Sequence, residues 1–394
     1  MAIKYIDQLD LKNKKVLIRV DYNVPYDKSM NITDDSRIKA TIPTLKHCLD
    51  QDAIVILMSH LGRPKGQIVP EMSLKPVARR LSEVIGKDVT FIDKSIKEGI
   101  NDDIDALKPG DVALLENIRF YPEENKNDEE FGKLLASFAD VYINDAFATA
   151  HRAHASNNAV TRYVSECAAG FLMKNEIEYF NKALLKPDRP VSAIIGGVKI
   201  STKIEVLKNI LDKVDNLLIG GGMSYTFLKS MGYDIGKSVV ENDHLNTAKE
   251  IREMAEKNNV NLYLPDDIVV AYSFDNPDGK SISAVDKIPS DMEGVDIGPE
   301  TRKKYSEIIK NSKTIVWNGP VGAFETPEFA EGTNELAKVV AESDCLSLIG
   351  GGDTGSALSA SGYADKMSYI STAGGAFLEL MEGKTLPAFE ALDN

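Results

Sequence analysis

Short apolar runs alternate with amphipathic segments along the N-terminal half of the chain. The runs predict buried strands at Lys15–Val20, Ala53–Met58, Val89–Ile92, Val112–Leu115 and Val141–Ile143. Between them, apolar residues at helical spacing predict helices at Ile38–Leu49, Pro76–Ile85 and Glu129–Phe138. This alternation is typical of an α/β fold, in which a mainly parallel sheet is covered by helices.

The C-terminal half repeats the alternation, but its predicted strands run into glycine. After Val191–Ile195 come Gly196 and Gly197, and then apolar residues at helical spacing from Ile200 to Val214. A helix there would place Lys199 and Lys203 on one side of its first turns. Four further stretches combine a predicted strand with a glycine-rich loop: Asn216–Phe227, Thr314–Glu325, Leu346–Ala357 and Ser368–Phe377. A fifth stretch, Tyr263–Ala271, predicts one or two more strands without such a loop.

A longer amphipathic segment, Ala168–Pro187, separates the two halves. Met173, Ile177, Phe180 and Leu184 mark one helical face, and Pro187 and Pro190 end the helix. The strand-end loops change from arginine to glycine after this segment, so we expect the domain boundary along it.

Composition restricts the function classes. The chain has 394 residues and a formal net charge of −14, which argues against general binding of nucleic acid or of acidic membranes. Cys48, Cys167 and Cys345 form no CxxC pair, and no segment reads as a signal peptide or a membrane span. We therefore expect a cytoplasmic protein with at least two domains.

Charged and polar residues collect where the N-terminal strands end. Because ligands of parallel sheets bind beyond the carboxyl ends of the strands, these residues predict a pocket for a small, multiply charged anion. Arginine suits such a pocket, since its planar fork grips carboxylate or phosphate with two bonds. Ordinary rim ion pairs are the alternative interpretation. The residues are Asp21, Asn23, Arg37, His60, Arg63, Arg119, His151 and Arg152.

In the C-terminal half, glycines before a helix, together with Lys199 and Lys203, predict a phosphate site, with solvated lysines at a helix start as the alternative. Asp353 follows Gly350–Gly352 and could cap the next helix or hold Mg²⁺ together with phosphates. Glu325 could contact a ribose hydroxyl.

His151 and His154 have HxxH spacing, but Arg152 between them argues against a metal ion there. His47 lies in a helical pattern and is interpreted as structural. The chain lacks GxxxxGK[ST], GxGxxG after a strand, GxSxG and an HRD loop.

The order of the motifs resembles that of the phosphoglycerate kinase family over essentially the whole chain. The motifs are RVDYNVP, SHLGRP, ENIRF, NDAFATAHRAHAS, GGVKISTK, IGGGMSYTF, WNGPVGAFE, GGGDT and STAGGA. Departures from the family pattern fall at Ala148, Val198, Ala323 and Ala373.

The resemblance implies two Rossmann-like α/β domains joined by a hinge helix: residues 1–170 for phosphoglycerate, 171–187 as the bridging helix, 188–375 for nucleotide and 376–394 as a tail that returns to the first domain. It implies a monomeric glycolytic enzyme that transfers a phosphoryl group between 1,3-bisphosphoglycerate and ADP, giving 3-phosphoglycerate and ATP. Hinge bending would close the cleft between its domains.

The same resemblance assigns residues to roles. Asp21, Asn23, Arg37, His60, Arg63, Arg119 and Arg152 would bind phosphoglycerate, and Arg37 and Lys199 would meet the transferring phosphoryl group. Lys203, Glu325, Gly351, Gly352, Asp353 and Thr354 would bind ATP or ADP, with Asp353 on Mg²⁺. Asp21 could act as a general base, but the attacking ADP oxygen is already ionised, so a hydrogen bond to the substrate hydroxyl is the preferred role.

Two functions of other classes remain to be separated from this one by experiment. A binding protein for a phosphorylated metabolite also uses two α/β lobes and a hinge. An NAD-linked dehydrogenase is disfavoured by the missing glycine fingerprint.

Overall fold

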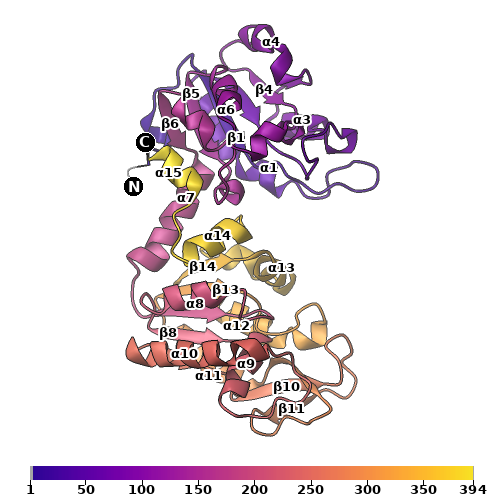
Figure 1. Ribbon diagram of the computed structural model, residues 1–394, viewed down its shortest axis with the longest axis vertical. Coiled ribbons are helices and arrows are strands. Elements are labelled where there is room, and N and C mark those ends of the chain that lie inside the picture. Colours follow the sequence, from indigo (N-terminus) through magenta and orange to yellow (C-terminus); the bar gives the residue numbers. More distant parts are fainter. Residues whose placement is uncertain (1–2, 394) are drawn as a thin grey trace. The chain divides into compact units, whose positions relative to one another are not determined.

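The computed structural model describes residues 3–393, which form two compact units. The N-terminal unit runs up to Ile177 and includes the chain from Thr385 onward, and the C-terminal unit is Glu178–Lys384 (Figure 1). The unit limits therefore fall within one helix and just before the last helix, whereas the sequence analysis drew its limits at residues 170, 187 and 375. No helix within the described residues is both long enough and apolar enough to cross a membrane.

The N-terminal unit is built on a six-stranded sheet in the order β3-β4-β2-β1-β5-β6. All neighbouring strands are parallel, with Leu17 of β1 opposite Ile56 of β2 and Tyr142 of β5. Because both faces are covered, the central strands are buried along nearly their whole length. The strands are β1 Lys15–Val20, β2 Ile54–Met58, β3 Val89–Ile92, β4 Val112–Leu115, β5 Val141–Asp145 and β6 Glu166–Ala169.

The predicted helix Ile38–Leu49 is instead two helices, α1 Ser36–Ala40 and α2 Ile42–Leu49. Pro43 lies in the first turn of α2, where its missing N–H costs nothing. The Thr41 hydroxyl donates to the Ile38 carbonyl (2.9 Å) at the break. The other helices of this unit are α3 Lys75–Ile85, α4 Asn101–Asp105, α5 Pro122–Asn125, α6 Glu129–Ala136 and α15 Pro387–Leu392.

Helix α7, Phe171–Phe180, contains the limit between the units, because Ile177 belongs to the first and Glu178 to the second. The segment predicted as one helix from Ala168 differs at both ends. Its first two residues belong to β6, and a π-helical turn, Asn181–Leu185, follows α7. On the predicted apolar face, Met173 and Leu184 are buried, whereas Ile177 and Phe180 are only half-buried.

The C-terminal helix α15 packs on the N-terminal unit beside β6 (Figure 1). The Phe389 ring stacks on Phe147 with 6.1 Å between ring centroids, and the Ala388 N–H donates to the Ala150 carbonyl (3.1 Å). Both contacts lie against the loop that follows β5, which also carries Arg152.

The C-terminal unit has its own six-stranded parallel sheet, in the order β15-β14-β13-β7-β8-β9. The strands are β7 Val191–Ile195, β8 Asn216–Ile219, β9 Asn261–Tyr263, β13 Thr314–Asn318, β14 Leu346–Gly350 and β15 Tyr369–Ile370. The helices are α8 Ile204–Ile210, α9 Met223–Ser230, α10 Leu245–Lys257, α11 Pro299–Lys310, α12 Glu331–Glu342, α13 Gly352–Ser361 and α14 Gly374–Met381. The fold is thus α/β, with a mainly parallel sheet covered by helices in each unit.

A small antiparallel sheet in this unit was not predicted. It has the order β11-β10-β12, with strands β10 Asp267–Ala271, β11 Ser281–Ala284 and β12 Glu293–Ile297. The stretch Tyr263–Ala271 contains β10 and only the last residue of β9, Asn261–Tyr263, and of these two strands only β9 joins the main sheet. Between the two strands lie Leu264, Pro265 and Asp266, and a proline followed by an aspartate is typical of a turn at which the chain can change sheets.

The helix predicted from Ile200 is shorter than expected, since α8 begins only at Ile204. The residues before it form a loop, in which the Lys203 N–H donates to the Ile200 carbonyl (2.8 Å). Glu241 holds this loop by accepting from the Ser201 N–H (3.0 Å) and hydroxyl (2.6 Å). The prediction that Lys199 and Lys203 share a helix face is therefore wrong.

Candidate functional site

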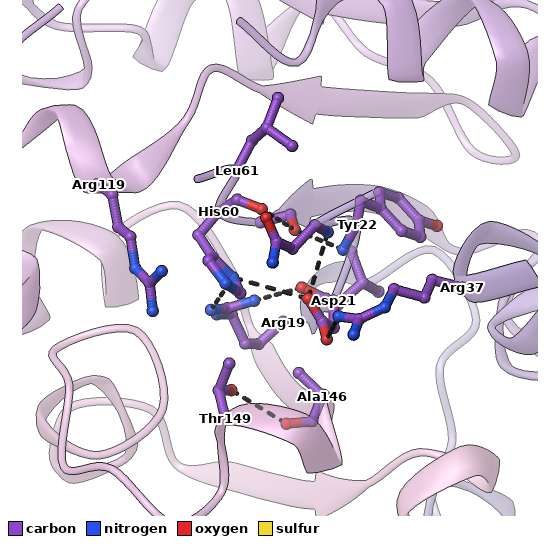
Figure 2. Close-up of polar contacts among 12 residues, drawn as sticks. Arg19, Asp21, Tyr22, Arg37, His60, Leu61, Arg119, Ala146 and Thr149 are labelled. Carbon is purple, nitrogen blue, oxygen red and sulfur yellow. Dashed lines mark hydrogen bonds and ion pairs between the residues drawn. The ribbon is translucent and has the colours of Figure 1, made fainter. Parts of the chain in front are cut away.

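The charged residues of the N-terminal unit meet at one edge of its sheet. Strands β4, β2, β1 and β5 are neighbours, and because they are parallel their carboxyl ends lie together. Asp21, His60 and Arg119 follow β1, β2 and β4, and Arg37 reaches them from α1 (Figure 2). The strand-end pattern therefore brought together residues that are far apart in the sequence.

Asp21 lies at the centre of this cluster. One of its carboxylate oxygens forms an ion pair with the Arg37 guanidinium, and the other accepts from the Asn23 N–H (3.2 Å). The Asn23 side chain in turn accepts from the Gly62 N–H (2.9 Å), which ties the loop after β1 to the loop after β2. The Arg37 side chain remains 39% exposed, so it can bind an anion without leaving its place.

His60 is almost fully buried among arginines. Its Nδ1 lies 3.1 Å from Nη2 of Arg19 and 3.8 Å from the Asp21 carboxylate. Burial, followed by the charges of Arg19 and Arg119, holds the pKa of His60 well below its usual range. At neutral pH the ring is therefore uncharged and serves as a hydrogen-bonding group.

Three further arginines of the predicted set differ in exposure. Arg119 is buried, its Nη1 donates to the Gly62 carbonyl (2.9 Å), and its Nε is buried without a hydrogen-bond partner in the described chain. Burial, with Arg19 and Arg152 nearby, lowers the pKa of Arg119 to about 10. Arg63 and Arg152 are exposed, and Arg152 Nε lies 3.1 Å from His151 Nε2. This excess of positive charge over carboxylates fits an anionic ligand.

Sequence reasoning missed the buried layer beneath the cluster. Arg19 in β1 is fully buried and bonds to Ser156, whose N–H and hydroxyl are both held by the buried Glu124. One signal was available, because Arg19 is a charged residue inside the apolar run KVLIRV. Glu124 and Ser156 carry no comparable signal.

His154 adds an acid-sensitive element to this layer. Burial and the charges of Arg119 and Arg19 lower its pKa to about 3, whereas an unfolded histidine titrates near 6.5. The unfolded chain therefore binds the extra proton between these values, and stability is lost as the pH falls below about 6.5. We expect His154 to cost ~2 kcal/mol of unfolding free energy between pH 7 and pH 5.

Urea unfolding followed by far-UV circular dichroism at both pH values checks this prediction. The His154→Gln variant should lose less stability on acidification than the parent. The same loss in both proteins would show that His154 is not a source of the acid sensitivity.

In the C-terminal unit, glycines allow three strand-end loops to pack backbone against backbone. A Cβ on Gly196 would lie 2.0 Å from the Pro320 carbonyl oxygen, and one on Gly319 would lie 2.4 Å from the Gly196 oxygen. Gly221, at φ +67°, would meet the Gly197 oxygen at 2.7 Å. These glycines therefore hold the loops after β7, β8 and β13 together.

Lys203 is linked to the last residue of β14 through Asn318. The Lys203 ammonium donates to the side-chain and main-chain oxygens of Asn318, whose Nδ2 donates to the Gly350 carbonyl (2.8 Å). Burial lowers the pKa of Lys203 to about 8, and Asp353 acts in the opposite direction. Asn318 is another residue at this edge of the sheet that sequence reasoning missed. Its signal was an asparagine at the end of a buried strand.

The helix start at α13 is open. A Cβ on Gly352 would meet nothing within 4 Å, and the nearest atom to one on Gly374, at the start of α14, is the Gly352 nitrogen at 3.6 Å. Thr354 is buried and accepts from the Gly319 N–H (2.7 Å). Two helix N-termini thus lie side by side without side chains between them, which suits phosphate oxygens.

Gly351 is the N-cap of α13, so the interpretation of Asp353 as the N-cap is wrong. Asp353 is exposed in the first turn of the helix. No group of three or more His, Cys, Asp or Glu within residues 3–393 could hold a metal ion. A single carboxylate beside a phosphate site fits Mg²⁺ held mainly by the nucleotide's own phosphates.

The remaining predicted residues lie around this edge with few contacts. Lys199 and Glu325 are exposed, in the loops after β7 and β13. Val198 is 61% exposed, and the Ala323 N–H donates to the Val295 carbonyl (2.8 Å). Ala373 has φ −136°, a conformation open to any residue, so its methyl group imposes no backbone strain at the start of α14. Ala148 is half-buried in a turn of the N-terminal unit.

Comparison with known proteins gives one consistent result. The model of the family "phosphoglycerate kinase" matches residues 6–384. The chain is 49% identical over 395 residues to phosphoglycerate kinase of Geotalea uraniireducens, and 51% identical over 394 residues to that of Pelobacter propionicus. Each alignment covers 100% of this chain and 99% of the relative.

Solved structures agree with the sequence comparison. The structure of phosphoglycerate kinase from Coxiella burnetii matches with a TM-score of 0.94 at 45% identity, covering 99% of both chains. The enzyme from Pyrococcus horikoshii matches with a TM-score of 0.83 at 32% identity, covering 99% of this chain and 98% of the other.

Proposed function

The chain belongs to the phosphoglycerate kinase family, and from that premise we propose how its own residues perform the reaction. The activity is phosphoryl transfer between 1,3-bisphosphoglycerate and ADP, a step of glycolysis, with a carboxyl group as the acceptor in the reverse direction. The observation that carries the residue assignment is the arginine cluster at the strand ends of one unit and the open helix start in the other.

The N-terminal cluster would bind phosphoglycerate. Asp21 accepts the substrate hydroxyl, while Arg63, Arg119 and Arg152 bind the anionic groups. Arg37 faces the transferring phosphoryl group, and Asn23 holds the loops in register through Gly62. The buried Nε of Arg119, which has no hydrogen-bond partner among residues 3–393, is available for a substrate oxygen.

The C-terminal cluster would bind the nucleotide. Lys203 and the N–H groups of Gly351, Gly352 and Thr354 hold the phosphates, Lys199 meets the transferring phosphoryl group, and Glu325 binds a ribose hydroxyl. Asp353 would hold Mg²⁺, which when bound supplies further neutralisation of phosphate charge.

No proton needs to move in the central step. An ionised terminal oxygen of ADP forms a bond to the phosphorus of the acyl phosphate, the bond from phosphorus to the acyl oxygen breaks, and the carboxylate of 3-phosphoglycerate leaves with the electron pair. Positioning and charge neutralisation therefore supply the catalysis. Arg37 and Lys199 are the residues that we assign to the moving phosphoryl group.

A coupled assay for ATP-dependent phosphorylation of 3-phosphoglycerate tests this function directly. The expected result is turnover that requires both substrates and Mg²⁺. A protein that binds the phosphorylated metabolite without turnover, or one that reduces NAD, would give no signal in this assay.

Catalysis by Arg37 and Lys199 requires the two units to close on the substrates, because the residues belong to different units. Small-angle scattering with 3-phosphoglycerate and a nucleotide together should show a smaller radius of gyration than the free protein. Each substrate alone is the control. An unchanged profile with both would contradict closure.

The lowered pKa of Lys203 predicts a pH dependence of nucleotide binding. The free ammonium loses its proton near pH 8, whereas a phosphate partner favours the charged form. ADP affinity should therefore fall about tenfold per pH unit above pH 8. Isothermal titration calorimetry in buffers of different ionisation enthalpy measures both the affinity and the proton uptake.

The Lys203→Arg variant is the matched control, because arginine stays charged. Its residual ADP affinity should not depend on pH in this range. Equal pH dependence in both proteins would remove Lys203 from the phosphate site.

We also propose that the chain acts as a cytoplasmic monomer. The net charge of −14 keeps copies apart and disfavours nucleic acid. Sedimentation equilibrium at micromolar concentration should give a single species near 43.2 kDa.

A further inference from the structure

Arg19 is a fully buried cation whose hydrogen bonds all go to neutral partners. Its Nε donates to the Ser156 hydroxyl oxygen (2.9 Å) and its Nη1 to the Val20 carbonyl. Its Nη2 lies 3.1 Å from His60 Nδ1 (Figure 2). A buried guanidinium is costly without a counter-charge, so the surroundings must supply one.

Glu124 supplies that charge through Ser156. The carboxylate is fully buried and accepts from the Ser156 hydroxyl (2.7 Å) and N–H (2.9 Å). The same hydroxyl oxygen accepts from Arg19, so the serine relays between the two charges. Burial raises the pKa of Glu124, and Arg19 opposes that rise. The relay fixes Arg19 without occupying its Nη2 group, which remains directed at His60.

The contact between Arg19 and His60 determines which ring nitrogen carries the hydrogen. A guanidinium has five donors and no acceptor, so Nδ1 must offer its lone pair. A neutral imidazole with a free lone pair on Nδ1 carries its hydrogen on Nε2. His60 Nε2 bonds to no described residue and is not among the buried atoms without a partner, so it is open to a ligand.

Asp21 competes for the same nitrogen. Its carboxylate lies 3.8 Å from His60 Nδ1, and a hydrogen on Nδ1 would be drawn to it. The Nδ1 atom thus faces a donor and an acceptor, and only the donor is within hydrogen-bond distance. Without Arg19, the ring would favour the form with hydrogen on Nδ1.

We propose that Arg19 is a positioning residue that holds His60 as the Nε2–H tautomer, so that the ring offers its one hydrogen to bound phosphoglycerate and leaves Asp21 for the substrate hydroxyl. The inference rests on the proposed substrate site. It adds that Arg19, which does not contact the substrate, determines which hydrogen bonds His60 can form with it.

The tautomer can be read directly from ¹⁵N chemical shifts of histidine in the substrate-free protein at pH 7, with His60 assigned by comparison with His60→Gln. We expect a protonated Nε2 and an unprotonated Nδ1. A hydrogen on Nδ1, or on both nitrogens, would overturn the proposal, and Arg19 and Glu124 stay unaltered in this arm.

The second arm removes the donor while keeping the buried charges balanced. The double variant Arg19→Met with Glu124→Gln removes both charges, and Glu124→Gln alone is its control. We expect the Nε2–H form in the control and the Nδ1–H form in the double variant. The KM for 3-phosphoglycerate should rise about tenfold from control to double variant, with the KM for ATP unchanged.

The Nε2–H form in the double variant would overturn the role of Arg19, and so would an equal KM for 3-phosphoglycerate in the two variants. An unchanged KM in His60→Gln would instead place His60 outside the substrate site. The two failures are thus distinguishable, since the tautomer is measured without substrate.

Discussion

Replacing Arg37 with alanine is expected to lower kcat by about 10²–10³, roughly 3–4 kcal/mol, the loss found when a donor to a developing negative charge is removed. The side chain reaches the cluster from the short helix α1 and is held by Asp21, yet remains 39% exposed. Its guanidinium can therefore meet the phosphoryl group during transfer. Initial-rate kinetics in both directions measure the effect.

Lys39→Ala is the control on the same helix. Lys39 is 59% exposed and pairs with Asp35 away from Asp21, so its loss should change kcat little. The dissociation constant for ADP should be unaffected in both variants, because the nucleotide residues belong to the other unit. Near-normal turnover of Arg37→Ala would exclude this residue from the transfer step.

The sequence predicted the parallel sheets because their central strands are buried and appear as mainly apolar runs. Four of the five predicted N-terminal strands agree with the structure to within one residue, β5 extends two residues further, to Asp145, and β6 was not predicted. Asn144 and Asp145 are polar, so hydropathy alone ended that strand early. The carboxylate of Asp145 is nevertheless buried and accepts from the Met173 N–H (3.1 Å) at the start of α7.

Boundaries set by tertiary contacts could not be predicted. The start of α8 depends on Glu241, which holds Ser201 in a loop from 40 residues away. The position of the helix break at Thr41 depends on a local turn that the spacing of apolar residues does not distinguish from a continuing helix. The small antiparallel sheet forms because the chain changes sheet between β9 and β10. This change depends on the residues of the connecting loop and not on the periodicity of apolar positions.

The substrate cluster was predictable as a set because position at a strand end is readable from sequence. Its internal order was not. Arg19, Glu124 and Ser156 come from separate segments, and their mutual contacts arise only when β1, α5 and the loop after β5 pack together. The glycine loops show the same division, since the sequence indicated a close approach of backbone but not which glycines contact protein and which face a ligand.

The difference between glycines that contact protein and glycines that face a ligand leads to the second prediction with a large expected effect. Gly196→Ala should destabilise the protein by about 3 kcal/mol, because its methyl group would lie 2.0 Å from the Pro320 carbonyl oxygen, and that oxygen accepts from the Gly197 N–H (3.0 Å). Backbone held by such bonds has little room to yield. Gly352→Ala should leave the melting temperature unchanged or slightly higher, since its methyl group meets nothing within 4 Å and alanine favours a helix.

The ADP affinity of Gly352→Ala provides a second test. In Gly352→Ala the methyl group occupies the space in which phosphate oxygens would approach the start of α13, so ADP affinity should fall about tenfold to hundredfold, at 1.4 kcal/mol per factor of ten. Calorimetric titration with ADP and with 3-phosphoglycerate measures both sites in one protein, and the second affinity should not change. An unaltered ADP affinity in a fully folded Gly352→Ala protein would mean that the open helix start is not where the phosphates bind, and the nucleotide site would have to be sought around Lys203 and Asn318 alone.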